Sequence, residues 1–110
     1  MRRGDVYWVN LDPVIGSEVG RRRPAVVVQN EAANRSSSTV TVIPLTSSID
    51  RVYPFQILVA AGEGGLSRQS KALCEQVRTL SRQRLTDRLG HLPNERMDQI
   101  REALDRHLWV

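Results

Sequence analysis

An arginine followed by a proline, at the start of a mostly apolar run, is the feature of this chain best suited to chemistry. Arg23 precedes Pro24, and residues 25–29 form the run that follows. Proline disfavours helical geometry in the residue before it and has no backbone N–H, so Arg23 should be extended and lie where a loop becomes a strand. A guanidinium fixed at the rim of a sheet can grip a phosphate group.

A hydroxyl side chain is expected at the same rim. Thr46 opens a cluster of three hydroxyl residues that follows a second β-like run, residues 39–45. If the two runs pair antiparallel, Arg23 and Thr46 lie at the same end of the sheet. Ser17 and Glu18, in the loop before Arg23, could reach this rim as well. Such a set can bind a scissile phosphate without a metal ion, although a capped turn with solvated charges is the alternative interpretation.

The charge balance favours a polyanionic partner. The 110 residues include 16 Lys and Arg against 12 Asp and Glu, for a net charge of +4, and Lys71 is the only lysine. Arginine matches phosphate oxygens better than lysine does, so nucleic acid is favoured over a membrane lipid. A basic surface that serves only solubility is the competing explanation.

No motif in the sequence indicates a metal site, a disulfide bond or a membrane span. The two histidines and the single cysteine have no zinc-ligand spacing, so neither a metal nor another cofactor is expected. His91 and His107 are expected to be structural, and Cys74 a small core residue. No apolar run approaches the roughly 20 residues of a membrane span, and no secretory signal opens the chain. A cytoplasmic protein without membrane contact is expected.

The elements that must position these residues are mainly strands. The ranges expected as strands are 6–11, 25–29, 39–45, 55–59, 71–79 and 89–92. The second of them should be buried on both faces, and Pro44 suggests that the third is an edge strand or carries a bulge. One helical turn fits residues 30–38, and Ser81 should cap a short turn at residues 82–84.

A helix should close the chain. After Pro93, apolar residues recur at spacings of three and four, which places on one helix face Met97, Ile100, Leu104 and Leu108. Many short strands followed by one helix predict a mainly β fold with some α, a small barrel closed by a C-terminal helix. Residues 1–110 are expected to form a single domain.

The motifs, taken together, resemble the MazF/PemK family of toxin endoribonucleases. The matching stretches are RGDVYWV at 3–9, LDP at 11–13, GSE at 16–18, RPAVVVQN at 23–30, PLTS at 44–47, YPF at 53–55, CEQVRT at 74–79 and LTDRLG at 85–90. They run in order over nearly the whole chain, which is more specific than any one motif. The resemblance implies an SH3-like barrel of the CcdB/PemK type with a terminal helix, in a homodimer.

The resemblance also implies a function. It is that of a type II toxin, a sequence-specific, ribosome-independent, metal-independent endoribonuclease that cleaves single-stranded mRNA by attack of the RNA's own 2′-hydroxyl. Arg23 and Thr46 match the catalytic arginine and threonine, whereas Ser17, Glu18 and Gln76 match the substrate side, with Glu18 able to take the 2′-hydroxyl proton. The usual partner is a MazE-like antitoxin with an acidic, flexible tail.

Two other functions stay open at this point. A gyrase poison of the CcdB type acts through its C-terminal residues and cleaves nothing, and the ending Leu108-Trp109-Val110 gives it some support. Packing of Trp109 on the barrel or on a dimer partner explains the same residues. A non-catalytic RNA-binding barrel would need exposed aromatic side chains on which bases stack.

Overall fold

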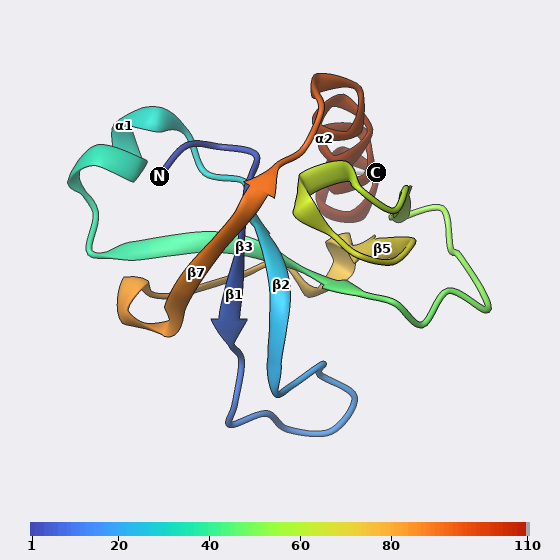
Figure 1. Cartoon of the computed structure of the whole chain (residues 1–110), viewed down its shortest axis with the longest axis horizontal. Helices are drawn as coiled ribbons and strands as arrows, with labels where there is room; N and C mark the ends of the chain where they lie inside the picture. The colour runs from blue at the N-terminus through green and yellow to red at the C-terminus, as the bar shows by residue number, and fades with distance from the viewer. Residues whose placement is uncertain (110) are drawn as a thin grey trace.

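A twisted antiparallel sheet with one long helix forms the structure, a computed structural model that describes residues 1–109 (Figure 1). The seven strands are β1 (Asp5–Asn10), β2 (Arg22–Val27), β3 (Thr39–Thr46), β4 (Gln56–Val59), β5 (Ser70–Leu73), β6 (Arg78–Ser81) and β7 (Leu85–His91). The helices are α1 (Glu31–Ser36) and α2 (Asn94–Leu108), and the 3₁₀ turns are η1 (Glu63–Gly65), η2 (Cys74–Gln76) and η3 (Arg82–Arg84). The mainly β fold with a C-terminal helix is therefore confirmed.

The strand order is β4-β5-β3-β2-β1-β7, and β6 also pairs with β3. Within residues 1–109 no pairing joins the outer strands β4 and β7, so the sheet stays open and the word barrel describes it only loosely. No helix in this part of the chain is long and apolar enough to cross a membrane.

Both faces of the central strand β2 are buried, as its apolar run predicts. Val26 belongs to one core cluster, whereas its neighbours Ala25 and Val27 belong to a second. Successive side chains of a strand point to opposite faces, so the two clusters lie on opposite faces of the sheet. The register aligns Val6, Val26 and Ile43 across three strands within the first cluster.

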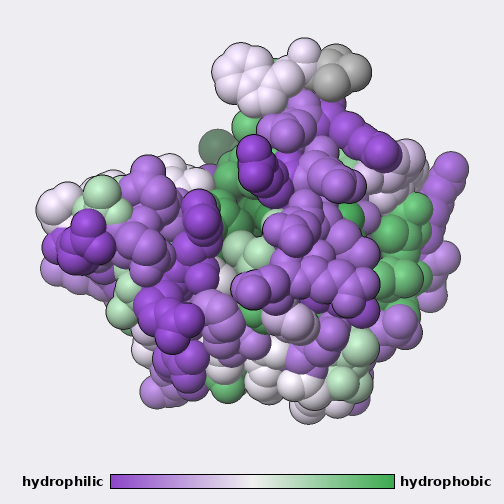
Figure 2. Space-filling model, turned by 90° about the horizontal axis from the view of Figure 1, so that it is seen from above, coloured by the Kyte–Doolittle hydropathy of each residue, from purple (hydrophilic) through white to green (hydrophobic). Residues whose placement is uncertain are grey.

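The helix α2 covers the first cluster. Ile100 and Ala103 are buried, and Met97 and Leu104 pack against the same core, as the spacing predicts. Leu108, expected on the same face, is 56% exposed, and the neighbouring Trp109 is 81% exposed. Seen from above, hydrophilic side chains dominate the surface, and hydrophobic side chains are visible beside α2 (Figure 2).

Of the two alternatives expected at Pro44, an edge strand or a bulge, the edge strand is wrong. The strand β3 is interior, because it pairs with β2 on one side and with β5 and β6 on the other. The second side changes partner within the strand: residues 39–42 pair with β6, and Leu45 and Thr46 pair with β5. Pro44 lies between the residues of β3 that pair with β6 and those that pair with β5. Its missing N–H therefore removes no hydrogen bond to either of these two strands.

Two other boundaries also differ from expectation. Residues 71–79 are not one strand, because η2 interrupts them between β5 and β6. The last strand, β7, starts at Leu85 rather than at residue 89. The helical turn within 30–38 is present as α1, and the Ser81 hydroxyl accepts from the backbone N–H of Gln83 as a cap of η3.

Candidate active site

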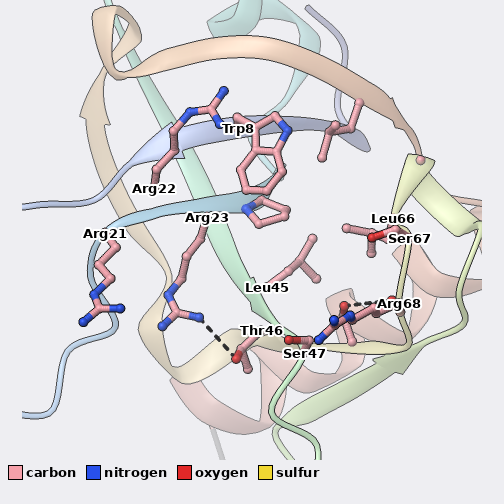
Figure 3. Close-up of a pocket in the computed structure, with 14 residues that line it drawn as sticks. Trp8, Arg21, Arg22, Arg23, Leu45, Thr46, Ser47, Leu66, Ser67 and Arg68 are labelled. Atoms are coloured by element: carbon pink, nitrogen blue, oxygen red, sulfur yellow. Dashed lines mark hydrogen bonds between the residues drawn. The ribbon is translucent and has the colours of Figure 1, made fainter.

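Arg23 and Thr46 meet at one end of the β2–β3 pair. The strands are antiparallel, with Ala25 opposite Pro44, so the start of β2 lies beside the end of β3. Nη1 of Arg23 donates a hydrogen bond to Oγ1 of Thr46 over 3.3 Å, and Nε donates to the carbonyl of Gly20 over 2.8 Å. The guanidinium is thus held by the Gly20 backbone and by the Thr46 hydroxyl, and Figure 3 shows the second of these bonds.

The hydrogen-bonding capacity that remains at this pair suits a phosphate. Oγ1 of Thr46 accepts from Arg23 and, over 3.2 Å, from the backbone N–H of Ser48. Both contacts use its lone pairs, so its own hydrogen is left to donate to a ligand. Arg23 has five N–H groups, of which these contacts use two. The pair can therefore donate several hydrogen bonds to one anionic group.

A cavity of about 580 Å³ opens beside the pair. Its wall contains four arginines and no Asp or Glu; the lining residues are Trp8, Arg21, Arg22, Arg23, Pro24, Leu45, Thr46, Ser47, Gly65, Leu66, Ser67, Arg68, Ser70 and Leu89. A concave surface with charge of one sign focuses its field and attracts the opposite charge. This cavity is accordingly suited to an anion.

Arg22 and Trp8 form one wall of the cavity. The guanidinium carbon of Arg22 lies 4.6 Å from the centre of the Trp8 ring. Nη2 of Arg22 also donates to Thr86 and Asp87, over 3.2 Å each. Arg22 is thereby held over the indole, a geometry that stabilises both side chains. Sequence reasoning assigned Trp8 no place in the site, because nothing in the local pattern distinguishes it from a core aromatic.

Ser17, Glu18 and Gln76 lie apart from this cavity. Glu18 and Gln76 line a separate hollow of about 290 Å³, and Ser17 is exposed in the same loop as Glu18. Oε1 of Glu18 accepts from the backbone N–H of Ile15 over 2.6 Å, and Oε1 of Gln76 accepts from that of Val19 over 2.8 Å. The expectation that Ser17 and Glu18 share a rim with Arg23 and Thr46 is not met in this conformation.

The remaining ionisable groups have structural contacts. The ring of His91 contacts the buried carboxylate of Asp5 over 2.9 Å, and Arg88 donates to the same oxygen over 3.2 Å. Burial opposes the charge of Asp5, but these bonds and one from the Arg2 amide outweigh it and lower its pKa to about 2. Cys74 is fully buried, and burial raises the pKa of its thiol to about 12. Both agree with the structural roles expected for His91 and Cys74.

Other sequence-based candidates find no place at the cavity. His107 lies near Phe55, with ring centres 6.2 Å apart. Within residues 1–109, no group of three His, Cys, Asp or Glu side chains is arranged to hold a metal ion. Trp109 does not pack on the sheet, and Val110, the last residue of the proposed gyrase-binding ending, lies outside the described residues.

Comparison with known proteins gives consistent matches over the full chain. Residues 2–108 match the family model described as the PemK-like, MazF-like toxin of type II toxin-antitoxin systems. Endoribonuclease MazF9 of Mycobacterium tuberculosis is 43% identical over 113 residues, which is 98% of this chain and 96% of that protein. These sequence matches extend well beyond the candidate site.

Solved structures match as well. The crystal structure of MazF from Deinococcus radiodurans superposes with a TM-score of 0.87 at 29% identity, covering 100% of this chain and 97% of the other. An endoribonuclease in complex with its cognate antitoxin, from a mycobacterial species, superposes with a TM-score of 0.81 at 26% identity, covering 98% and 94%. The open sheet with its terminal helix is therefore the architecture of these toxins.

Proposed function

Because the chain belongs to the PemK-like, MazF-like toxin family of type II toxin-antitoxin systems, we propose that it is an endoribonuclease that cleaves single-stranded mRNA. It acts on a specific sequence, without the ribosome and without a metal ion. The observation that carries the proposal is the contact between Arg23 and Thr46 in a cavity lined by arginines and no carboxylate. Neither a CcdB-type gyrase poison nor a non-catalytic RNA-binding barrel gains support from the relatives described above.

The proposed reaction is a transesterification at phosphorus. The 2′-oxygen of the RNA forms a bond to the adjacent phosphorus while the bond from phosphorus to O5′ breaks. The products are a 2′,3′-cyclic phosphate and a 5′-hydroxyl, and the proton lost by the 2′-hydroxyl is balanced by the one gained at O5′. Arg23 binds the non-bridging oxygens and stabilises their growing charge, and the Thr46 hydroxyl donates to one of them.

Removal of the 2′-hydroxyl proton is better suited to a group other than Arg23. A guanidinium stays protonated in proteins, so it serves to bind charge rather than to accept a proton. Glu18 is the carboxylate proposed for this role from the sequence, but its side chain contacts the Ile15 amide and lines the other hollow. Glu18 can take the 2′-hydroxyl proton only if the loop that carries it moves toward Thr46. Ser17 and Gln76 are proposed as further contacts of the RNA strand.

The proposed partners follow from the same cavity. An antitoxin of the MazE type, with an acidic tail, would bind where the arginines attract RNA, and a related endoribonuclease has been solved with its cognate antitoxin.

We further propose that the chain acts in the cytoplasm as one toxin domain, residues 1–110, and forms a homodimer. Exposed Leu108 and Trp109 offer apolar surface that a second copy could cover. Sedimentation should then give twice the mass of the chain.

The test is cleavage of a mixed pool of synthetic single-stranded RNA in the presence of EDTA. We expect cuts at one short sequence, with products that carry 5′-hydroxyl and 2′,3′-cyclic phosphate ends. A 2′-deoxy nucleotide on the 5′ side of the cut should block the reaction, because it removes the nucleophile. Cleavage that depends on added metal would contradict the proposal, as would RNA binding without any product. Toxicity lost on deletion of residues 109–110, with cleavage intact, would instead favour a gyrase-poison mechanism.

A further inference from the structure

Arg68 is an arginine of the cavity that the sequence did not suggest. It lines the cavity together with Arg23 and Thr46, although it lies 22 positions after Thr46 in the chain. Its side chain is exposed and, within residues 1–109, makes no hydrogen bond or ion pair. Arg22 and Arg23 differ in this respect, because each donates to other protein groups. The Arg68 guanidinium therefore keeps its full donor capacity for a ligand.

The position of Arg68 complements that of Arg23. In Figure 3 the two guanidinium groups lie on opposite sides of Thr46, and the Arg68 side chain reaches beside Ser47. The Arg21 guanidinium likewise makes no hydrogen bond or ion pair with residues 1–109, but it lies on the same side as Arg23 and points away from Thr46. Arg68 is thus the arginine that extends the anionic binding surface across the cavity.

A rigid segment carries Arg68. Leu66 and Ser70, on either side, are each 5% exposed, and the Ser70 hydroxyl donates to the Arg68 carbonyl over 3.0 Å. The segment follows a turn in which Gly65 has a φ of +75°, and a Cβ there would lie 2.1 Å from the Leu89 carbonyl oxygen. Only glycine fits that approach. The backbone of Arg68 is consequently held in place before any ligand binds, which lowers the entropic cost of binding.

We propose that Arg68 is a substrate-binding residue that holds the RNA phosphate next to the scissile one. The proposal rests on the endoribonuclease function proposed above. Arg23 and Thr46 already share the scissile phosphate, and a single strand carries a phosphate at every nucleotide. If the strand runs past Thr46, its neighbouring phosphate lies at Arg68. The planar guanidinium of Arg68 can donate to two oxygens of that phosphate. No carboxylate of the cavity wall competes for it.

The first test measures binding of an RNA that cannot be cut, with a 2′-O-methyl group at the cleavage position. We expect Arg68→Ala to weaken binding about 10- to 100-fold, as loss of a charge-assisted contact does. The slope of log affinity against log salt should also fall by about 0.7, the value for one phosphate of a single strand. Arg68→Lys should recover part of the affinity. The control is Arg35→Ala, an exposed arginine of α1 whose side chain makes no hydrogen bond or ion pair within the described residues.

The second test locates the phosphate. Methylphosphonate groups replace, one at a time, the phosphates that flank the scissile bond, which removes their charge. At one position we expect wild type to lose as much affinity as Arg68→Ala loses on unmodified RNA, and the variant to lose nothing further. In cleavage of the natural RNA, KM should rise more than kcat falls.

Three outcomes would contradict the role of Arg68, and a fourth would contradict the function on which that role rests. If the affinity losses caused by Arg68→Ala and by the methylphosphonate multiplied at every flanking position, the role of Arg68 would be overturned. Wild-type affinity in Arg68→Ala would overturn it as well. A melting temperature of Arg68→Ala well below that of Arg35→Ala would also contradict it, because it would assign Arg68 a structural role. Failure of the wild type to cleave any RNA contradicts the endoribonuclease proposal and is seen before any variant is made.

Discussion

Oε1 of Gln76 accepts a hydrogen bond from the backbone N–H of Val19 over 2.8 Å, across 57 positions of the chain. This contact fastens the β1–β2 loop, residues 11–21, to the turn η2. Arg78 also donates to the Leu11 carbonyl over 3.3 Å and holds the start of the loop. In the part of the chain that the structure describes, residues 13–18 in the middle of the loop make no hydrogen bond outside the loop, and Ile15 is 85% exposed. Gln76 is thus one of the contacts that hold this loop, which must move for Glu18 to reach Thr46.

Gln76→Ala should release the far end of this loop. The substitution removes the acceptor of the Val19 amide, so we expect hydrogen exchange at that amide to accelerate about tenfold, as the loss of one hydrogen bond implies. Exchange in β2 and β3 should stay unchanged. Gln83→Ala, at an exposed glutamine of η3, is the matched control. Unchanged exchange at Val19 in Gln76→Ala would show that Gln76 does not hold the loop.

Arg23→Ala and Thr46→Ala should each lower kcat about 100- to 1000-fold, the range for loss of one donor to a charge that develops in the transition state. Thr46→Ser should keep most of the activity because it retains the hydroxyl. The melting temperatures should stay close to that of wild type, since both side chains lie at the rim rather than in the core. Arg101→Ala, at an exposed position of α2, controls for loss of charge. Full activity in Arg23→Ala would overturn the mechanism.

The stability of the fold should depend on the ionisation of Asp5. Its pKa is about 2 in the folded chain, against an ordinary value of 3.8. The lowered pKa contributes about 2 kcal/mol above pH 4, and this contribution is lost as the pH falls from about 4 to 2. Urea unfolding across this range should show the decrease in the free energy of unfolding. Asp5→Asn should remove this pH dependence and should lower the free energy of unfolding at neutral pH by about 2 kcal/mol. If Asp5→Asn lost stability with acid as steeply as the control Asp50→Asn, other groups would be responsible.

Cys74 should be unreactive in the native protein. Cys74 is the first residue of η2 and its thiol is fully buried; burial, followed by the nearby charge of Glu75, raises its pKa to about 12. Thiolate is the reactive form, so labelling by a disulfide reagent at neutral pH should be at least about 100-fold slower than in urea. Rapid labelling of one thiol per native chain would show that the segment opens readily.

The fold could be predicted from the sequence where the local signal was strong. The strand β2 combines β-branched residues with a proline at its start, and α2 repeats apolar residues at helical spacing, so both were recognised. The error at Pro44 has a non-local origin. Pro44 fits in an interior strand because the partner on one side of β3 changes there, and that change is a property of the β5 and β6 pairings.

The candidate site was predictable only in part, for a similar reason. Arg23 and Thr46 could be placed together because antiparallel pairing of two adjacent strands brings their ends to one rim. Ser17 and Glu18 could not be placed, since a loop of this length has no periodicity and is held by contacts with distant residues, such as that of Val19 with Gln76. Trp8 and Arg68 have no local motif that separates them from an ordinary strand residue and an ordinary loop arginine.

What the sequence by itself determined is the β-rich fold, its closing helix, the family and the pair of Arg23 with Thr46. The strands and the helix follow from residue type and short-range spacing. The family follows from the resemblance of ordered motifs along the chain, and the pair from antiparallel pairing of two adjacent strands. What only the tertiary structure decided is that Arg68 faces Arg23 across one cavity and that Glu18 is held away from it. Both depend on contacts between residues far apart in the chain, such as Gly65 with Leu89 and Gln76 with Val19. Such contacts exist only once the whole sheet has formed.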